Sequence, residues 1–130
     1  MIYQALVVDD DIEIMVLICE ILSQDNFVCQ GIGGAKEALD MGASKLEEFS
    51  IIFTDLKMPS IDGFEFVYFL KRLGINTPVV AITGLEDKGK SIFELKDGRQ
   101  RLLPQAIIQK PFTSEEIQKV HHLLKPSKSA

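Results

Sequence analysis

Residues 50–55, Ser-Ile-Ile-Phe-Thr-Asp, decide the fold that this sequence predicts. The three central residues are consecutive and apolar, which is typical of a short strand buried on both faces of a parallel sheet. In the loop that follows, Pro59 ends the strand and Asp62 can cap the next helix. Asp55 is therefore expected at the carboxyl end of a buried strand, where open α/β sheets form their functional sites. Taken alone, Asp55 is explained equally well as a turn or helix-capping aspartate.

Four more short apolar runs predict strands, at residues 5–8, 27–32, 77–82 and 106–108. Helical patterns fill the intervals at residues 12–22, 35–48 and 63–73, and a last helix is expected from a Thr113 or Ser114 cap to Leu124. The interval at residues 85–105 is the least regular, because Gly89, Gly98 and Pro104 interrupt any longer helix.

Strands that alternate with helices predict an α/β fold, because each parallel crossover needs a helix that covers the sheet. We expect a single flavodoxin-like, doubly wound sheet of five parallel strands in the order 2-1-3-4-5, with an irregular segment between strands 4 and 5. The 130 residues suit one domain. We assign residues 1–125 to this domain and residues 126–130 to a tail or the start of a linker.

Composition argues against several classes of protein. The net charge is −5 and no block of lysine or arginine occurs, so direct nucleic-acid binding is not expected. No apolar run approaches the roughly 20 residues of a membrane span, so we expect a cytoplasmic protein without membrane contact. Cys19 and Cys29 are too few and too widely spaced for a disulfide framework or a zinc site, and are expected to be buried small apolar residues.

Polar residues gather where the predicted strands end. The first strand is followed by Asp9-Asp10-Asp11, and the others bring Asp55, Thr83 and Lys110 to the same edge of the sheet. Carboxylates on adjacent strands repel by roughly 3 kcal/mol per pair at a separation near 5 Å. A Mg²⁺ ion would relieve this repulsion, since it prefers oxygen ligands. The alternative, that the acidic run only caps a helix, explains Asp11 well but Asp9 and Asp10 poorly.

A carboxylate nucleophile, a divalent cation, a lysine and a hydroxyl together suit phosphoryl transfer onto Asp55. Lys110 is expected about 10 Å from Asp55 across the sheet, within the reach of a long side chain. Thr83, one strand away, can bring a hydroxyl to the same point. In isolation, Thr83 would be a turn residue and Lys110 a solvated surface charge.

The ordered motifs are Val7-Val8-Asp9-Asp10, residues 55–63 (Asp-Leu-Lys-Met-Pro-Ser-Ile-Asp-Gly), Thr83-Gly84 and Lys110-Pro111-Phe112. Together they resemble the receiver domain of two-component response regulators. The resemblance implies that Asp55 is the phosphoacceptor and that Asp10, Asp55 and the backbone carbonyl of Lys57 hold Mg²⁺, with Asp9 acting through a water. It also implies that Thr83 and Lys110 contact the phosphoryl oxygens.

The same resemblance implies a histidine kinase or a histidine phosphotransfer protein as phosphodonor, and a downstream protein target or an attached output domain. The chain would be no enzyme beyond its own phosphorylation and slow dephosphorylation. Two features depart from the family pattern. Ile107 stands where the family usually has an aromatic switch residue, and the segment between Thr83 and Lys110 is longer than usual.

Three other functions compete with this one. A haloacid-dehalogenase-type phosphatase would need a carboxylate two positions after Asp55, where the chain has Lys57. A flavin-binding flavodoxin relative would need a hydroxyl-rich phosphate loop after the first strand, where acids stand instead. A receiver-like module that binds a protein without being phosphorylated stays open as the alternative, although the intact acidic set argues against it.

Overall fold

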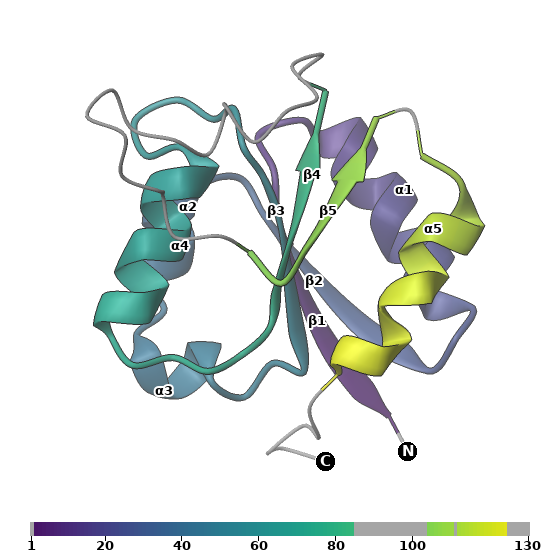
Figure 1. The fold of residues 1–130 in the computed structure, drawn as a ribbon, viewed down its shortest axis with the longest axis horizontal. Coiled ribbons are helices and arrows are strands. Elements are labelled where there is room, and N and C mark those ends of the chain that lie inside the picture. The colour runs from purple at the N-terminus through teal and green to yellow at the C-terminus, as the bar shows by residue number, and fades with distance from the viewer. Residues whose placement is uncertain (1, 85–103, 111, 125–130) are drawn as a thin grey trace.

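The computed structural model describes residues 2–84, 104–110 and 112–124. Its centre is a parallel sheet of five strands in the order β2-β1-β3-β4-β5, as the sequence predicts (Figure 1). The strands are β1 (Tyr3–Val8), β2 (Phe27–Ile32), β3 (Ile51–Asp55), β4 (Val79–Thr83) and β5 (Ala106–Gln109).

Helices cover both faces of this sheet, which makes the fold doubly wound (Figure 1). On one face lie α1 (Ile12–Ser23) and α5 (Ser114–Gln118), and α5 continues as a 3-10 helix, η2 (Lys119–Leu123). On the other face lie α2 (Ala35–Leu39), α3 (Ala43–Leu46) and α4 (Gly63–Arg72). None of the helices in the described part of the chain is long and apolar enough to cross a membrane.

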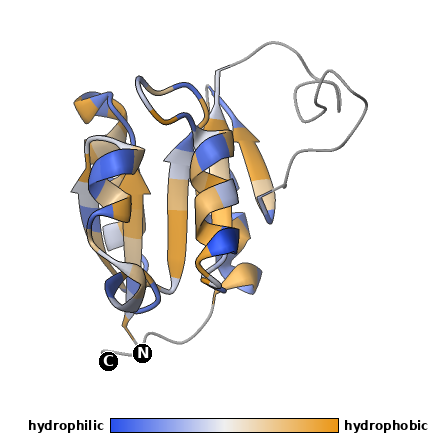
Figure 2. Ribbon diagram, turned by 90° about the vertical axis from the view of Figure 1, so that its left-hand side faces the viewer, coloured by the Kyte–Doolittle hydropathy of each residue, from blue (hydrophilic) through white to orange (hydrophobic). Residues whose placement is uncertain are grey.

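The alternation of side chains along β1 separates the core into two layers. Ala5 and Val7 pack in a cluster with Ile18 of α1, whereas Leu6 and Val8 pack in a second cluster with Phe66 of α4. Strands β3 and β4 are apolar up to their polar carboxyl ends, and hydrophobic residues run along the strands of the sheet in Figure 2. Strands β3 and β4 are thereby buried on both faces, as continuous apolar runs predict.

The helix expected over residues 35–48 is wrong, because the chain forms two short helices there. Between α2 and α3, Gly42 adopts a φ of +90°, a backbone conformation that continues no right-handed helix. The caps of the other helices follow the sequence. Asp62 and Glu65 form a capping box at α4, and Thr113 and Glu116 form another at α5.

The two cysteines were expected to need no role beyond packing, and this expectation is also wrong. Cys19 of α1 and Cys29 of β2 form a disulfide, and both residues are only partly buried. The irregular segment expected between strands 4 and 5 lies mostly at residues 85–103, outside the described residues. The proposed tail, residues 126–130, lies outside them as well.

Candidate functional site

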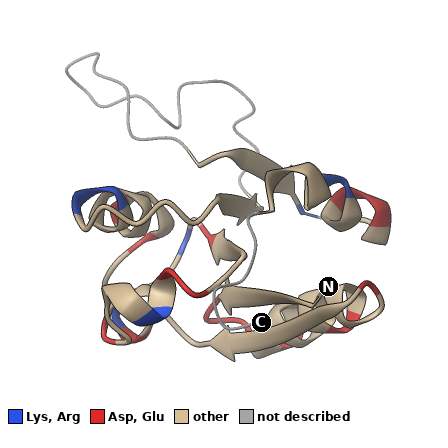
Figure 3. Cartoon of the chain, turned by 90° about the horizontal axis from the view of Figure 1, so that it is seen from below, with Lys and Arg blue, Asp and Glu red and all other residues tan. Residues whose placement is uncertain are grey.

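The charged residue of the sheet stands at the end of its central strand. Among the described strands, Asp55, the last residue of β3, is the only charged side chain, and other acidic residues follow where strands end (Figure 3). Val8 of β1 pairs with Thr54 of β3, so Asp9 and Asp55 each come one residue later on adjacent strands. The register alone therefore brings these two carboxylates together.

Asp9, Asp10 and Asp55 form one acidic cluster, as the sequence predicts. Each offers a carboxylate oxygen, and these oxygens lie within 4.8 Å of one another. Asp9 and Asp55 are buried, whereas Asp10 is exposed. Asp11 is not part of the cluster, because its carboxylate caps α1 by accepting hydrogen bonds from the backbone N–H groups of Glu13 and Ile14.

The environment of Asp9 opposes its ionisation. Burial raises the pKa of the Asp9 carboxyl to about 6, and the nearby carboxylates of Asp55 and Asp10 act in the same direction. A hydrogen bond from the backbone N–H of Asp11 and the Lys110 ammonium both lower this pKa, without offsetting the burial. The ionised form of Asp9 is thus less favourable in the folded protein than in water.

Lys110 reaches the cluster from the end of β5. Its Nζ lies 3.6 Å from Asp55 Oδ2 and 3.8 Å from Asp9 Oδ2, so one ammonium bridges two strand ends. The Lys110 backbone N–H donates to the Thr83 carbonyl oxygen at 2.7 Å, which fixes the start of this side chain. The long cation does cover the distance that the predicted strand order requires.

The loop after β3 supports Asp55 through contacts that sequence reasoning missed. The Lys57 backbone N–H donates to Asp55 Oδ1 at 3.3 Å. Gly63, the first residue of α4, lies so close to β3 that a Cβ there would collide with the Asp55 carbonyl oxygen and stand 2.7 Å from Leu56 Cα. The glycine after the Asp62 cap was the available signal, since a glycine at such a position indicates a close backbone approach.

Two predicted residues lie on β4 and β5. Thr83 ends β4 and is buried, one strand from Asp55, whose register partner on β4 is Ile82. Ile107 of β5 is 45% exposed, so the position where the family usually has an aromatic residue presents an aliphatic side chain to solvent. The roles assigned to Thr83, Ile107 and the Lys57 carbonyl stay predictions.

The donor set fits a hard divalent cation. It consists of carboxylate oxygens from Asp9, Asp10 and Asp55, and the exposed side of Asp10 leaves room for water ligands. Mg²⁺ prefers oxygen ligands, keeps several of its waters and needs only one or two carboxylates. Its charge would favour the ionised form of Asp9, against the burial and the neighbouring carboxylates that raise the pKa of this group.

Comparison with known proteins agrees with this geometry. The family model of the response regulator receiver domain matches residues 5–122. The receiver domain of Francisella response regulator 1452 superposes with a TM-score of 0.76 at 29% identity, over 93% of this chain and 95% of that one. The chemotaxis response regulator CheY4 of Vibrio cholerae, 23% identical, shares the fold with a TM-score of 0.73 over 95% of this chain and all 100% of its own.

Curated relatives include the cell cycle response regulator CtrA of Brucella ovis, 28% identical over 130 residues that cover 96% of this chain and 51% of the relative. The chain thus spans about half the length of the curated relatives it matches. The family match covers both strand ends that carry the acidic cluster and the strand end that carries Lys110. The chain belongs to the response regulator receiver domain family of two-component signalling systems.

Proposed function

We propose that this receiver domain accepts a phosphoryl group on Asp55 in a Mg²⁺-dependent reaction. The observation that carries the proposal is the placement of Asp55 at a strand end, between the carboxylates of Asp9 and Asp10 and the Lys110 ammonium at 3.6 Å. A nucleophilic carboxylate with cationic groups around it is the arrangement that forms aspartyl phosphates.

The reaction exchanges one bond to phosphorus for another. A carboxylate oxygen of Asp55 attacks the phosphorus of a phosphohistidine, the new P–O bond forms as the P–N bond breaks, and the released imidazole takes a proton from solvent. Lys110 and the Thr83 hydroxyl then contact the phosphoryl oxygens. Catalysis of this kind rests on positioning and on neutralising charge, with little covalent work by the protein.

Mg²⁺ would neutralise charge on the incoming phosphoryl group and on the carboxylates. In this chain Asp10, Asp55 and the backbone carbonyl of Lys57 would hold the ion, and Asp9 would act through a water. Asp11 is excluded from this set because its carboxylate is already used to cap α1.

The phosphodonor would be a histidine kinase or a histidine phosphotransfer protein, and the chain would act in the cytoplasm. It would catalyse its own phosphorylation and slow dephosphorylation but turn over no separate substrate. Phosphorylation would switch the interaction with a downstream protein or with an attached output domain, without direct contact to nucleic acid. Support for this assignment comes from the family and from the net charge of −5.

The test is phosphorylation by a small donor, acetyl phosphate, in the presence of Mg²⁺. We expect one added phosphate, mapped to Asp55 by mass spectrometry, and none in Asp55→Asn. Asp62→Asn is the matched control, because asparagine caps a helix as well as aspartate while one carboxylate of the same loop is removed.

Modification that persists in Asp55→Asn would move the phosphoacceptor to another residue. If neither acetyl phosphate nor a cognate phosphohistidine modifies the wild-type protein, the alternative of a non-phosphorylated binding module replaces this proposal.

A further inference from the structure

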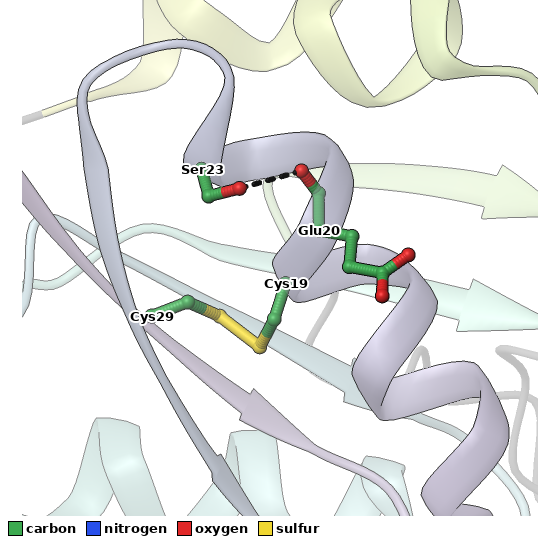
Figure 4. Close-up of a disulfide and its surroundings, with 4 residues drawn as sticks. All are labelled: Cys19, Glu20, Ser23 and Cys29. Atoms are coloured by element: carbon green, nitrogen blue, oxygen red, sulfur yellow. Dashed lines mark hydrogen bonds between the residues drawn. A yellow bond between two sulfur atoms is a disulfide. The ribbon is translucent and has the colours of Figure 1, made fainter.

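A disulfide joins helix α1 to strand β2, which lies at the edge of the sheet and is separated from β3 by β1. It links Cys19 of α1 to Cys29 of β2, with Cα atoms 5.5 Å apart (Figure 4). Strand β2 is an edge strand, since it pairs only with β1 within the five-stranded sheet. These 130 residues contain no other cysteine, so any thiol chemistry of this domain takes place here.

Cys19 and Cys29 both line an open cavity of about 410 Å³. Met15, Val16, Glu20 and Gly31 form other parts of its wall. Val16 is 49% exposed and Glu20 is exposed as well, so the cavity opens to solvent beside the disulfide. A thiolate must approach a disulfide sulfur directly to exchange with it, and this cavity provides the access.

The fold around the disulfide rests on contacts that do not depend on it. Ile18 and Leu22 of α1 belong to the same buried cluster as Phe27 of β2. One turn before Cys19, Met15 lies on the backbone of Gly31, where a Cβ would collide with its sulfur. We therefore expect α1 to stay packed on β2 when the covalent bond is open, so that the fold is kept in both redox states.

We propose that Cys19 and Cys29 form a reversible thiol–disulfide exchange site, open in the native protein to low-molecular-weight thiols and disulfides, whose oxidation clamps α1 to β2. In reduction, a thiolate of a dithiol attacks one cysteine sulfur, the S–S bond breaks and a mixed disulfide forms. The other cysteine is released as a thiolate and takes up a proton. The second thiolate of the reagent then attacks the reagent's own sulfur in the mixed disulfide, and the remaining cysteine leaves as a thiolate that is also protonated. Two electrons and two protons pass from the reagent to the cysteines, and the reagent leaves as its own disulfide.

The first experiment measures how fast dithiothreitol reduces the intact chain under native conditions, with thiols trapped by iodoacetamide and counted by mass. We expect two alkylated cysteines, a rate that is proportional to dithiothreitol concentration, and no change of this rate in urea below the unfolding transition. Oxidised dithiothreitol should restore the bond. A rate that climbs with urea in parallel with global unfolding would overturn the proposal, because the bond would then be reachable only in unfolded chains.

Two tryptophan variants test the access route. Val16→Trp places a large side chain at the wall of the cavity and should slow reduction several-fold. Leu17→Trp, on the next residue of α1, is the matched control, since Leu17 is exposed but does not line the cavity. Equal rates in the two variants would show that reagents do not reach the sulfurs through this cavity.

The clamp itself is tested by hydrogen exchange in the oxidised and reduced protein. Opening the bond should speed amide exchange in the C-terminal half of α1 and in β2 by about tenfold, which corresponds to about 1.4 kcal/mol of local stability. The double variant Cys19→Ser/Cys29→Ser should show no response to the reagent. Equal protection of these segments in both redox states of the wild type would overturn the clamp.

Discussion

Asp9 is the most deeply buried carboxylate of the site, with 1% of its surface exposed compared with 8% for Asp55. Its pKa, about 6 in the folded state, lies above the ordinary value of 3.8 because burial disfavours the charged form. Between these two values the unfolded chain loses the proton that the folded chain still holds. Stability from this residue therefore falls as the pH rises from about 4 to about 6, and the penalty persists above that range.

We expect Asp9→Asn to stabilise the metal-free protein above about pH 7 by up to about 3 kcal/mol, since a pKa shift of one unit corresponds to about 1.4 kcal/mol. The gain should vanish near pH 3, below both pKa values, where the wild-type carboxyl is protonated in both states. Asparagine keeps the oxygen that accepts the Asp11 N–H. Urea unfolding with a chelator at the two pH values measures the difference.

Asp40→Asn is the control for the loss of one negative charge, because Asp40 is an exposed residue at the end of α2. A stability gain in Asp9→Asn that is the same at both pH values would contradict the assignment of this penalty to Asp9 ionisation.

The grouping of residues at strand ends could be predicted, because parallel strands bring their carboxyl ends to the same edge of the sheet. This reasoning placed Asp9, Asp10, Asp55 and Lys110 together. It did not find the pair of His121 and Asp25, which joins residues 96 positions apart. The His121 ring also contacts Tyr3 and Phe27. Such a contact depends on how η2 packs, which local pattern does not encode.

At the scale of elements, the limits of prediction have definite causes. The break between α2 and α3 was missed because the helix-favouring residues on either side outweighed one glycine, although its φ of +90° decides the backbone. The disulfide was missed because a spacing of 10 residues does not show that Cys19 and Cys29 come close across the α1–β2 turn. Caps were predicted correctly, since their hydrogen bonds are local in sequence.

Helix α4 and strand β3 meet at Gly63, and this contact couples the helix to the site. We expect Gly63→Ala to destabilise the protein by about 1–3 kcal/mol, because the methyl group must displace the backbone of Asp55 and Leu56. The displaced backbone should slow phosphorylation of Asp55 by about tenfold or more, since small misplacements of reacting groups are costly. Urea unfolding and the rate of modification by acetyl phosphate measure the two effects.

Gly33→Ala is the matched control, because nothing lies within 4 Å of a Cβ at Gly33. It should change stability by no more than about 0.5 kcal/mol. If Gly63→Ala matched this control in both measurements, the close approach of α4 to Asp55 would have no energetic consequence.

At the scale of the molecule, the packing of the sheet brings together carboxylates that repel one another. Two apolar clusters, one on each face of the sheet, hold the central strands in place and bury their ends. The same packing holds carboxylate oxygens of Asp9, Asp10 and Asp55 within 4.8 Å of one another, and the Lys110 ammonium lies against Asp9 and Asp55. The metal-free fold thus retains electrostatic repulsion that a bound cation would relieve.

We therefore expect Mg²⁺ to stabilise the whole molecule against urea. A ligand that binds only the folded state adds about 2.7 kcal/mol at a hundredfold excess over its dissociation constant. Asp10→Asn should lose most of this gain, because Asp10 supplies one of the clustered oxygens. Asp11→Asn should keep it, since asparagine preserves the cap of α1 while removing the same charge from the neighbouring position.

Sodium chloride at equal ionic strength separates binding of Mg²⁺ from screening of the net charge of −5. Equal losses in the two variants, or equal stabilisation by sodium chloride, would show that the acidic run acts only through its total charge and not as a site for the ion.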